Sequence, residues 1–278
     1  MKLTKFNSLP GDTPVDKLTR WSAGQQIYVQ PKFHGISCRW DGRTGEMYTR
    51  QGKLWDLDRF PPDMQDELSQ ISPLYYGELV IPNVPFPTAA GLLSVASDAP
   101  IPNTVRLHVY DFHDPNSPLQ SFSCRTIEIE QDLSGYTYLL PVITYIHAPI
   151  YADRRYDYLV EHGYEGCVYR LDPCLFDTAG TPHPQAVKRK KLHSAEWICV
   201  AVTEGLGKRR GMAGALILKN PTANTHVSVG GGEGITDEIL RNYFRNPPIN
   251  KPVTFTYEEL SRNGVPLRPQ LVGVRDYE

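Results

Sequence analysis

Short segments of alternating or continuous apolar residues, separated by proline and glycine, dominate the chain. Side chains of a strand alternate between its two faces, so this period predicts strands more often than helices. The predicted strands cover residues 27–40, 74–81, 105–112, 164–171, 197–203, 213–219 and 252–257. Helical spacing is rarer and predicts helices over residues 61–71, 153–162 and 236–244. The pattern therefore predicts an α+β fold.

The character of the chain changes near residues 192–194. After this point glycine is frequent, and about five segments with strand-like spacing accompany one good helix. A small five-stranded barrel of the OB type fits this arrangement. We therefore predict two domains, one at residues 1–192 and one at residues 193–278.

Composition and charge exclude several classes of protein. The chain has 278 residues, of which 40% are hydrophobic and 22% are charged, so it can bury a substantial core. Its net charge of −2 creates no global field for nucleic acid, so such a partner requires a local basic segment. Five cysteines without a CxxC pair argue against a disulfide framework and a zinc site. With no apolar leader or membrane span, we expect a cytoplasmic protein without a membrane partner. No long apolar surface helix or exposed strand segment is obvious, so we expect a monomer.

The first candidate for chemistry is the segment Lys32-Phe33-His34-Gly35. On an extended strand, Gln30 and Lys32 point to one side, while Val29 and Phe33 point into the core. A lysine on a stiff strand beside a glycine suits covalent capture of a phosphorus or carbonyl centre. Taken alone, the same tetrapeptide is also compatible with a solvated strand end.

Further polar residues stand in or beside apolar strands. Glu78 and Glu165 each place a carboxylate in a strand that is otherwise apolar, and two such carboxylates suggest one divalent ion. Arg50 stands at a turn, where its planar group could bind a phosphate or a ribose edge. Tyr110 belongs to a strand face that can stack a flat base, and this face carries Arg106, His108, Tyr110 and Phe112.

A basic segment closes the first predicted domain. Strand alternation over residues 186–191 turns Lys188 and Lys190 to one side and Arg189 and Lys191 to the other. A run of four cations is usually a solvated face. Together with an upstream lysine and two carboxylates, the pair of amines indicates a site for a triphosphate.

In this order, the segments resemble the covalent nucleotidyltransferases, and most closely the compact ATP-dependent DNA ligases of bacteriophages and bacteria. They stand at motifs I, Ia, III, IIIa, IV and V of that family: Lys32-x-x-Gly35, Arg50, Glu78, Tyr110-Asp111, Glu165-Gly166 and Lys188-x-Lys190. Residues 204–208, 211–216, 234–238 and 268–276 look like the OB domain of small phage-type ligases. The resemblance implies a nucleotidyltransferase (adenylation) domain of antiparallel sheets with flanking helices, followed by an OB-fold β-barrel.

The resemblance also implies an activity: sealing of 5′-phosphate/3′-hydroxyl nicks in duplex DNA, as in DNA repair, replication and recombination. Lys32 would attack the α-phosphate of ATP, release pyrophosphate and hold AMP. The adenylate would then pass to the DNA 5′-phosphate, and the 3′-hydroxyl would displace AMP. Because the lysine must lose its proton before it attacks, we expect Lys188, Lys190 and a bound metal to favour the neutral amine.

The resemblance assigns residues to each ligand. Those implied for the nucleotide are Gln30, Lys32, Arg39, Arg50, Glu78, Tyr110, Glu165, Lys188 and Lys190. Among them, Tyr110 would stack on adenine and Gln30 would lie beside the adenine edge. Glu78 and Glu165 would bind Mg²⁺, for which Mn²⁺ could substitute. The residues expected to contact nicked DNA are Lys191, Lys208, Arg209, Arg210 and Arg268.

The chain departs from the family pattern at several positions. His34 replaces the aspartate of motif I, and Ser37 stands where its arginine belongs, so we expect Arg39 to supply the guanidinium. The last family motif is degraded to residues 275–278, which leaves Arg268 as a candidate for orienting pyrophosphate. Two alternatives follow: an RNA-joining relative, because RNA ligases carry such a histidine, and an inactive nucleic-acid-binding protein with an OB module.

Overall fold

The structure is a computed structural model of the chain. It describes residues 2–72, 74–176, 182–232, 234–261 and 263–275. Residues 276–278, which belong to the degraded last motif, lie outside the described residues. The chain divides into two compact units, residues 1–190 and residues 191–278. Within the described ranges, no helix is both long and apolar enough to cross a membrane.

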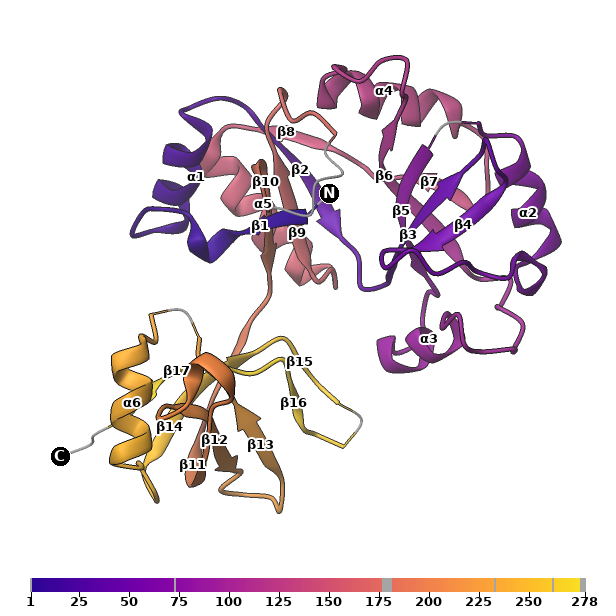
Figure 1. The fold of residues 1–278 in the computed structure, drawn as a ribbon. Helices are drawn as coiled ribbons and strands as arrows, with labels where there is room; N and C mark the ends of the chain where they lie inside the picture. Colours follow the sequence, from indigo (N-terminus) through magenta and orange to yellow (C-terminus); the bar gives the residue numbers. More distant parts are fainter. Residues whose placement is uncertain (1, 73, 177–181, 233, 262, 276–278) are drawn as a thin grey trace. The chain divides into compact units, whose positions relative to one another are not determined.

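The first unit contains two five-stranded sheets (Figure 1). Sheet A consists, in spatial order, of β1 (Lys2–Lys5), β10 (Pro182–Lys190), β9 (Gly166–Arg170), β2 (Ile27–Lys32) and β8 (Tyr145–His147). Only β1 and β10 pair in parallel, and the other neighbours are antiparallel. Helices α1 (Pro14–Ser22) and α5 (Pro149–Glu161) contact each other, and α5 also contacts β2 and β9.

Sheet B carries the other half of the first unit. Its strands, in spatial order, are β4 (Glu46–Thr49), β3 (Ile36–Asp41), β5 (Leu74–Val80), β6 (Arg106–His113) and β7 (Leu139–Pro141). Only β6 and β7 pair in parallel. Helices α2 (Pro62–Ser69) and α4 (Phe122–Asp132) contact this sheet, and α3 (Phe86–Leu92) lies in the connection between β5 and β6. The predicted mixed α+β class is confirmed.

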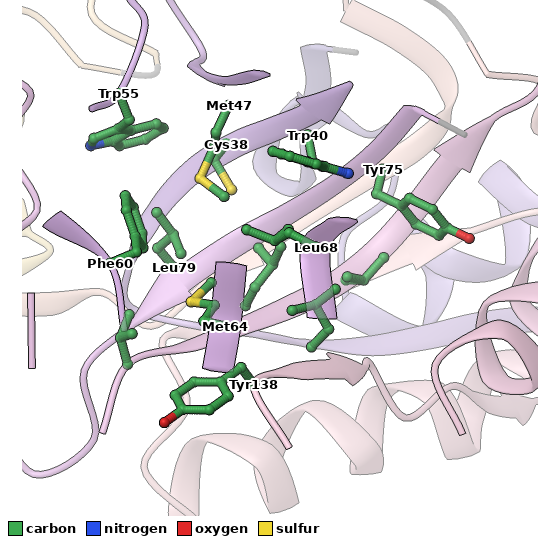
Figure 2. Packing of buried hydrophobic residues seen from close by; sticks show 14 of the residues in the cluster. Cys38, Trp40, Met47, Trp55, Phe60, Met64, Leu68, Tyr75, Leu79 and Tyr138 are labelled. Atoms are coloured by element: carbon green, nitrogen blue, oxygen red, sulfur yellow. The ribbon is translucent and has the colours of Figure 1, made fainter. Parts of the chain in front are cut away.

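One face of sheet B packs its apolar side chains against α2 (Figure 2). Trp40 and Met47 from the sheet meet Met64 and Leu68, which lie four residues apart on one face of the helix. All four side chains are at most 3% exposed. Burial of each stabilises the fold by about 1.5–3 kcal/mol. The opposite face of sheet B is therefore left for polar chemistry.

The predicted strand over residues 27–40 is wrong in one respect, because the structure divides it between two sheets. β2 ends at Lys32 in sheet A and β3 begins at Ile36 in sheet B. At Gly35 the chain passes so close to β5 that a Cβ atom would lie 2.3 Å from the carbonyl oxygen of Leu79. Phe33 follows the end of β2 and is half-buried, so the prediction that it points into the core is also wrong.

A β-bulge changes the faces predicted for β6. Opposite Tyr76 and Gly77 of β5 stand Asp111 and Val109, so Tyr110 is an extra residue in the ladder. Alternation therefore shifts at this point. Phe112 packs in the core with Val109 and is 2% exposed, so its predicted place on the face of Tyr110 is wrong.

Three helices agree with the sequence pattern and three were not predicted. α2, α5 and α6 (Asp237–Arg245) overlap the predicted helices, although α5 starts earlier because Pro149 suits the first helical position. The helices that were not predicted are α1, α3 and α4. α1 carries a readable signal, since Thr13 and Asp16 form a capping box ahead of its apolar positions.

The second unit is built on sheet C. Its strands, in spatial order, are β13 (His226–Val229), β12 (Ala213–Lys219), β11 (His193–Glu204), β14 (Pro252–Tyr257) and β17 (Gln270–Val274). The neighbours are antiparallel, and α6 covers β11 and β12. A separate hairpin joins β15 (Glu259–Leu260) to β16 (Pro266–Leu267). One parallel bridge between Gly230 and Gln270 links the outer strands, and no further pairing among the described residues closes a barrel.

Candidate active site

Lys32, Glu165 and Lys190 meet on one face of sheet A, and we call these three residues the Glu165 cluster. Gly166 pairs with Lys32 on one side and with Lys190 on the other, which brings both lysines to the residue before β9. The Nζ atom of Lys32 lies 2.6 Å from Oε2 of Glu165, and that of Lys190 lies 2.5 Å from Oε1. The three side chains are 13–18% exposed, so a ligand can reach them.

Glycine at position 166 is what allows this meeting. A Cβ atom there would lie 2.0 Å from the carbonyl oxygen of Arg189 in β10. The backbone N–H of Glu165 also donates to the carbonyl oxygen of Lys32 at 3.0 Å. The close pairing of three strands therefore fixes the backbone on which the cluster stands.

The two predicted carboxylates have opposite electrostatic environments. Burial acts to raise the pKa of Glu165, but the ammonium groups of Lys32 and Lys190 outweigh it, so the pKa lies below its ordinary value. Burial raises the pKa of Glu78; Lys32 opposes this shift, and the charge of Glu165 adds to it. Glu78 belongs to sheet B, opposite Ser37 in the ladder, so the two sheets bring their charges to a common region.

Gln30 and Tyr110, the two residues predicted to meet the base, lie close together in the structure. Gln30 precedes Lys32 by two residues in β2 and is 2% exposed. Its Nε2 donates to the carbonyl oxygen of Tyr110 at 3.3 Å and to the hydroxyl of Thr144 at 3.1 Å. The hydroxyl of Tyr110 lies 3.1 Å from that of Ser37, and burial raises the pKa of this phenol. A hydrogen bond thus joins sheet A to sheet B at this position.

A ring stack supports the residue directly after Lys32. The rings of Phe33 and His108 stack at 3.9 Å, and Tyr164 meets Phe33 edge-on at 5.3 Å. Burial, helped by the charge of Arg106, lowers the pKa of His108 to about 4, so its ring is neutral at physiological pH. The sequence predicted an aromatic and polar face here, but not which ring His108 would contact.

The arginines of the predicted site are separated. Arg39 shares a face of β3 with Ser37, and its guanidinium lies 4.6 Å from the ring centre of Tyr48. Its Nε atom is buried without a hydrogen-bond partner in the described part of the chain. Arg50 is exposed in the turn after β4 and makes no side-chain hydrogen bond or ion pair with any described residue. His34 stacks on Phe86 of α3 at 4.1 Å.

The basic segment at the end of the first unit follows its predicted alternation. Lys188 and Lys190 face the same side of β10 and are half-buried. Arg189 faces the other side, where it lies 2.5 Å from Asp153 and 3.7 Å from the ring centre of Tyr156. Lys191 is exposed at the start of the second unit. Of the four cations in this segment, Lys188 and Lys190 thus lie on the same face of sheet A as Lys32 and Glu165.

Apart from Lys191, the predicted DNA-contacting cations of the second unit lie in two places. Lys208, Arg209 and Arg210 are exposed in the connection from β11 to β12, and we call them the basic loop. The carboxylate of Glu204 accepts a hydrogen bond from the backbone of Gly211 at 2.9 Å and closes this loop. Arg268 lies in a different connection with a φ of 52° and pairs with the carboxylate of Glu258. The three cations of the basic loop are therefore exposed next to one another in the chain.

A buried ion cluster was not predicted. Asp111 accepts from Arg125 Nε at 2.7 Å and from Arg170 at 2.5 Å, and we call these three residues the Asp111 cluster. The exposed fractions of the side chains are 0% for the aspartate and 2% for each arginine. The cluster connects β6 of sheet B, β9 of sheet A and α4. Its partners are too far apart in sequence for any spacing rule to have found them.

Comparisons with known proteins agree with this architecture. The family model for the DNA ligase OB-like domain matches residues 204–275. A search of curated proteins gives no match. Among solved structures, one from work on Lig E DNA ligases, which describes DNA binding with a minimal scaffold, is 23% identical with a TM-score of 0.73 and covers 99% of this chain and 98% of its own.

Two further structures show the range of the likeness. The Chlorella virus DNA ligase-adenylate is 17% identical with a TM-score of 0.52 and covers 99% of both chains. The protein named Pmar-Lig_Pre is 16% identical with a TM-score of 0.77 and covers 91% of this chain but 64% of its own. The predicted resemblance is confirmed: the chain has the fold of compact DNA ligases, and its residues 204–275 match the family model of the DNA ligase OB-like domain.

Proposed function

We propose that this chain is an ATP-dependent DNA ligase that seals nicks in duplex DNA through a lysyl-AMP intermediate and a DNA-adenylate. The observation that carries the proposal is the Glu165 cluster: an accessible lysine amine, a second amine and one carboxylate converge on a sheet of a chain with a ligase fold. In this proposal residues 1–192 form the adenylation domain and residues 193–278 the OB-fold domain. The protein would act as a monomer in the cytoplasm.

In the first step, the lone pair of Lys32 Nζ attacks the α-phosphorus of ATP. A phosphorus–nitrogen bond forms, and the bond from this phosphorus to the oxygen of pyrophosphate breaks. The lysine, which is partly exposed, must first give up a proton to the solvent, and the ionised carboxylate of Glu165, 2.6 Å away, is placed to accept hydrogen bonds from the neutral amine and orient it. Lys188 and Lys190 would balance the charge that develops on the phosphate oxygens.

Glu78 and Glu165 fit a divalent cation of the kind that nucleotide enzymes use. Within the described ranges, no group of three or more His, Cys, Asp or Glu side chains forms a complete metal site. Mg²⁺ commonly binds one or two carboxylates together with substrate phosphates, so two carboxylates beside a triphosphate suffice. Burial raises the pKa of Glu78 and the charge of Glu165 adds to this shift, so a cation would relieve the repulsion between the two carboxylates. When bound, the metal would act as a Lewis acid and neutralise charge.

The nucleotide base would lie between the two sheets of the first unit. As the resemblance implies, Tyr110 would stack on adenine and Gln30 would meet its edge. The amide of Gln30 donates to the backbone carbonyl oxygen of Tyr110, which keeps the two residues together. Arg39 would take the place of the family arginine, since its unpartnered Nε is available for a ribose or phosphate oxygen. Arg50, on its exposed turn, would contact a phosphate.

In the second step, an oxygen of the DNA 5′-phosphate attacks the phosphorus of lysyl-AMP and Lys32 leaves as an amine. In the third, the 3′-hydroxyl attacks the activated 5′-phosphate, the phosphodiester bond forms and AMP leaves. DNA would be held by its phosphates through Lys191, Arg268 and the basic loop. Such binding reads no sequence, which suits an enzyme that must act at any nick.

Incubation with ATP labelled on the α-phosphate and Mg²⁺ tests the first step. We expect a labelled protein whose mass rises by about 329 Da, the mass of one adenylyl group. Nicked duplex DNA should then discharge the label and yield a sealed strand. A protein that binds DNA but never takes up label would overturn the proposal and favour the inactive OB-containing alternative.

Salt dependence tests the proposed binding of DNA. Replacing all three cations of the basic loop by glutamine should lower the slope of log affinity against log salt by about 0.9 for each DNA phosphate that is no longer neutralised. Lys219 is exposed at the end of β12 and provides a matched control, Lys219→Gln. Equal slopes for the two variants would contradict a role of the basic loop.

An RNA-joining activity is the second candidate, and His34 favours it. This residue stands where the DNA ligases of the resembled family have aspartate, and its ring stacks on Phe86. Parallel assays on nicked DNA and nicked RNA duplexes decide between the two. Faster sealing of RNA would replace the proposed substrate while leaving the lysyl-AMP chemistry in place.

A further inference from the structure

A short chain of hydrogen bonds that includes Thr144 and Val142 fixes the amide of Gln30. Its Nε2 donates to the carbonyl oxygen of Tyr110 at 3.3 Å and to Thr144 Oγ1 at 3.1 Å, and Thr144 Oγ1 donates to the carbonyl oxygen of Val142 at 3.2 Å. A backbone carbonyl can only accept, so the atom that faces Tyr110 must be the amide nitrogen. The hydroxyl hydrogen of Thr144 is used on Val142, so this hydroxyl can only accept from Gln30.

The other end of this amide is left without a partner. Gln30 Oε1 is buried and has no hydrogen-bond partner among the residues that the structure describes. Gln30 as a whole is 2% exposed, and it shares its face of β2 with Lys32, two residues further on. A buried acceptor that lacks a donor is unfavourable, and most such groups in folded proteins are satisfied. This oxygen therefore indicates a donor that arrives with the ligand.

We propose that Thr144 is a positioning residue for base specificity, which holds the amide of Gln30 so that its oxygen, and not its amino group, faces the base of the nucleotide. The inference rests on the proposed function. A purine with a 6-amino group offers this oxygen a hydrogen-bond donor, whereas a purine with a 6-oxo group offers a second acceptor. Thr144, in the connection from β7 to β8, thus selects adenine over guanine without touching the base.

Thr144→Val removes the hydroxyl and keeps the branched shape of the side chain. One N–H of the Gln30 amide then lacks its acceptor, and the amide can rotate. We expect the preference for ATP over purine riboside triphosphate, which lacks the 6-amino group, to fall about tenfold, as expected for the loss of one well-placed hydrogen bond. The KM for ATP should rise, while the maximal rate of adduct formation stays within about twofold.

The experiment measures initial rates of covalent nucleotidylation by intact mass, with ATP, GTP and purine riboside triphosphate as substrates. Thr144→Ser keeps the hydroxyl and should keep the wild-type preference. Thr126→Val is the matched control, because the hydroxyl of Thr126 donates only to the carbonyl oxygen of Ser123 in α4, at 2.8 Å. A purely structural role of Thr144 would lower all three rates together and leave their ratios unchanged.

A double-mutant cycle distinguishes a specific effect on base preference from the effect of a variant that folds poorly. Gln30→Leu removes the unpartnered oxygen, so adding Thr144→Val to it should change the preference no further. Additive losses, or a Thr144→Val preference within twofold of the Thr126→Val control, would overturn the inference and leave the proposed function intact. A wild-type protein that forms no adduct with any of the nucleotides would overturn the proposed function and the inference with it.

Discussion

Two carboxylates of the first unit each bind two cationic side chains, yet the two clusters differ in burial and in the cations they use. The Asp111 cluster uses arginines and is at most 2% exposed. The Glu165 cluster uses lysines, and its side chains are 13–18% exposed. The first connects two sheets and a helix, whereas the second stands on one face of sheet A.

The difference shows how one kind of ion cluster can serve either architecture or chemistry. Arginine keeps its charge at all ordinary pH values and binds a carboxylate with several fixed donors, which suits a permanent buried link. Lysine can become neutral and act as a nucleophile, which suits a group that must exchange its partner. The exposure of the lysines also matters, because a triphosphate can compete with Glu165 only for amines that it can reach.

The largest effect is expected at Lys32. Lys32→Arg keeps the positive charge and the ion pair with Glu165, but a guanidinium is not deprotonated in proteins and cannot form the adduct. We expect adenylation to fall by at least about 10⁴-fold, as for the loss of other covalent nucleophiles. Intact mass after incubation with ATP measures this. The free energy of unfolding should change by less than about 1 kcal/mol, because the charge pair is preserved.

A substitution in the Asp111 cluster should instead cause a large loss of stability. Asp111→Asn leaves two buried arginines without their carboxylate, and breaking such a cluster costs about 3–5 kcal/mol. Denaturant unfolding followed by tryptophan fluorescence measures this loss. Glu165→Gln is the matched control and should cost about 1 kcal/mol or less, since its lysines still reach water. Equal losses in the two variants would contradict the division between architecture and chemistry.

The sequence predicted the residues of the Glu165 cluster but none of the arginines of the Asp111 cluster. Lys32 and Lys190 each stand on a strand whose alternation fixes the direction of the side chain, Glu165 comes directly before β9, and the resemblance supplied their grouping. Arg125 and Arg170 lie 14 and 59 residues from Asp111 along the chain. A charged residue on a buried face gives no sign of which distant charge will meet it.

The errors in the fold have a similar cause. Alternation predicted one strand over residues 27–40, but a close approach at Gly35 moves the chain from one sheet to the other. Alternation also placed Phe112 with Tyr110, and a single bulge reversed it. Both events depend on the neighbouring strand β5, which a local pattern does not contain. The OB-like second unit was easier to predict from the sequence, because its glycine-rich connections are themselves local signals.

Exchanging the cations of the two clusters should have smaller effects. Arg170→Lys replaces a planar guanidinium with several fixed N–H donors by a single ammonium group at a buried position. We expect a loss of about 1–3 kcal/mol in the free energy of unfolding. Lys190→Arg, in the more open cluster, should leave stability within about 0.5 kcal/mol. Denaturant unfolding of both variants measures the contrast. A destabilisation by Lys190→Arg as large as that of Arg170→Lys would show that the Glu165 cluster is packed as tightly as its counterpart.

The smallest effect expected is a pH dependence of opposite sign for the two carboxylates of the proposed site. The pKa of Glu165 is lowered in the folded protein, so its contribution to stability is present above the ordinary value of 4.5 and is lost as the pH falls below it. The pKa of Glu78 is raised, so its unfavourable contribution is present at neutral pH and disappears as the pH falls towards 4.5.

At pH 7, Glu165→Gln should therefore be slightly less stable than the wild type and Glu78→Gln slightly more stable, each by about 1 kcal/mol or less. Both differences should shrink as the pH is lowered, that of Glu78→Gln as the pH approaches 4.5 and that of Glu165→Gln only below it. Thermal unfolding at a series of pH values measures the two curves. Stability differences of the same sign for the two variants would mean that the carboxylates share one environment. The lysines would then not distinguish Glu165 from Glu78.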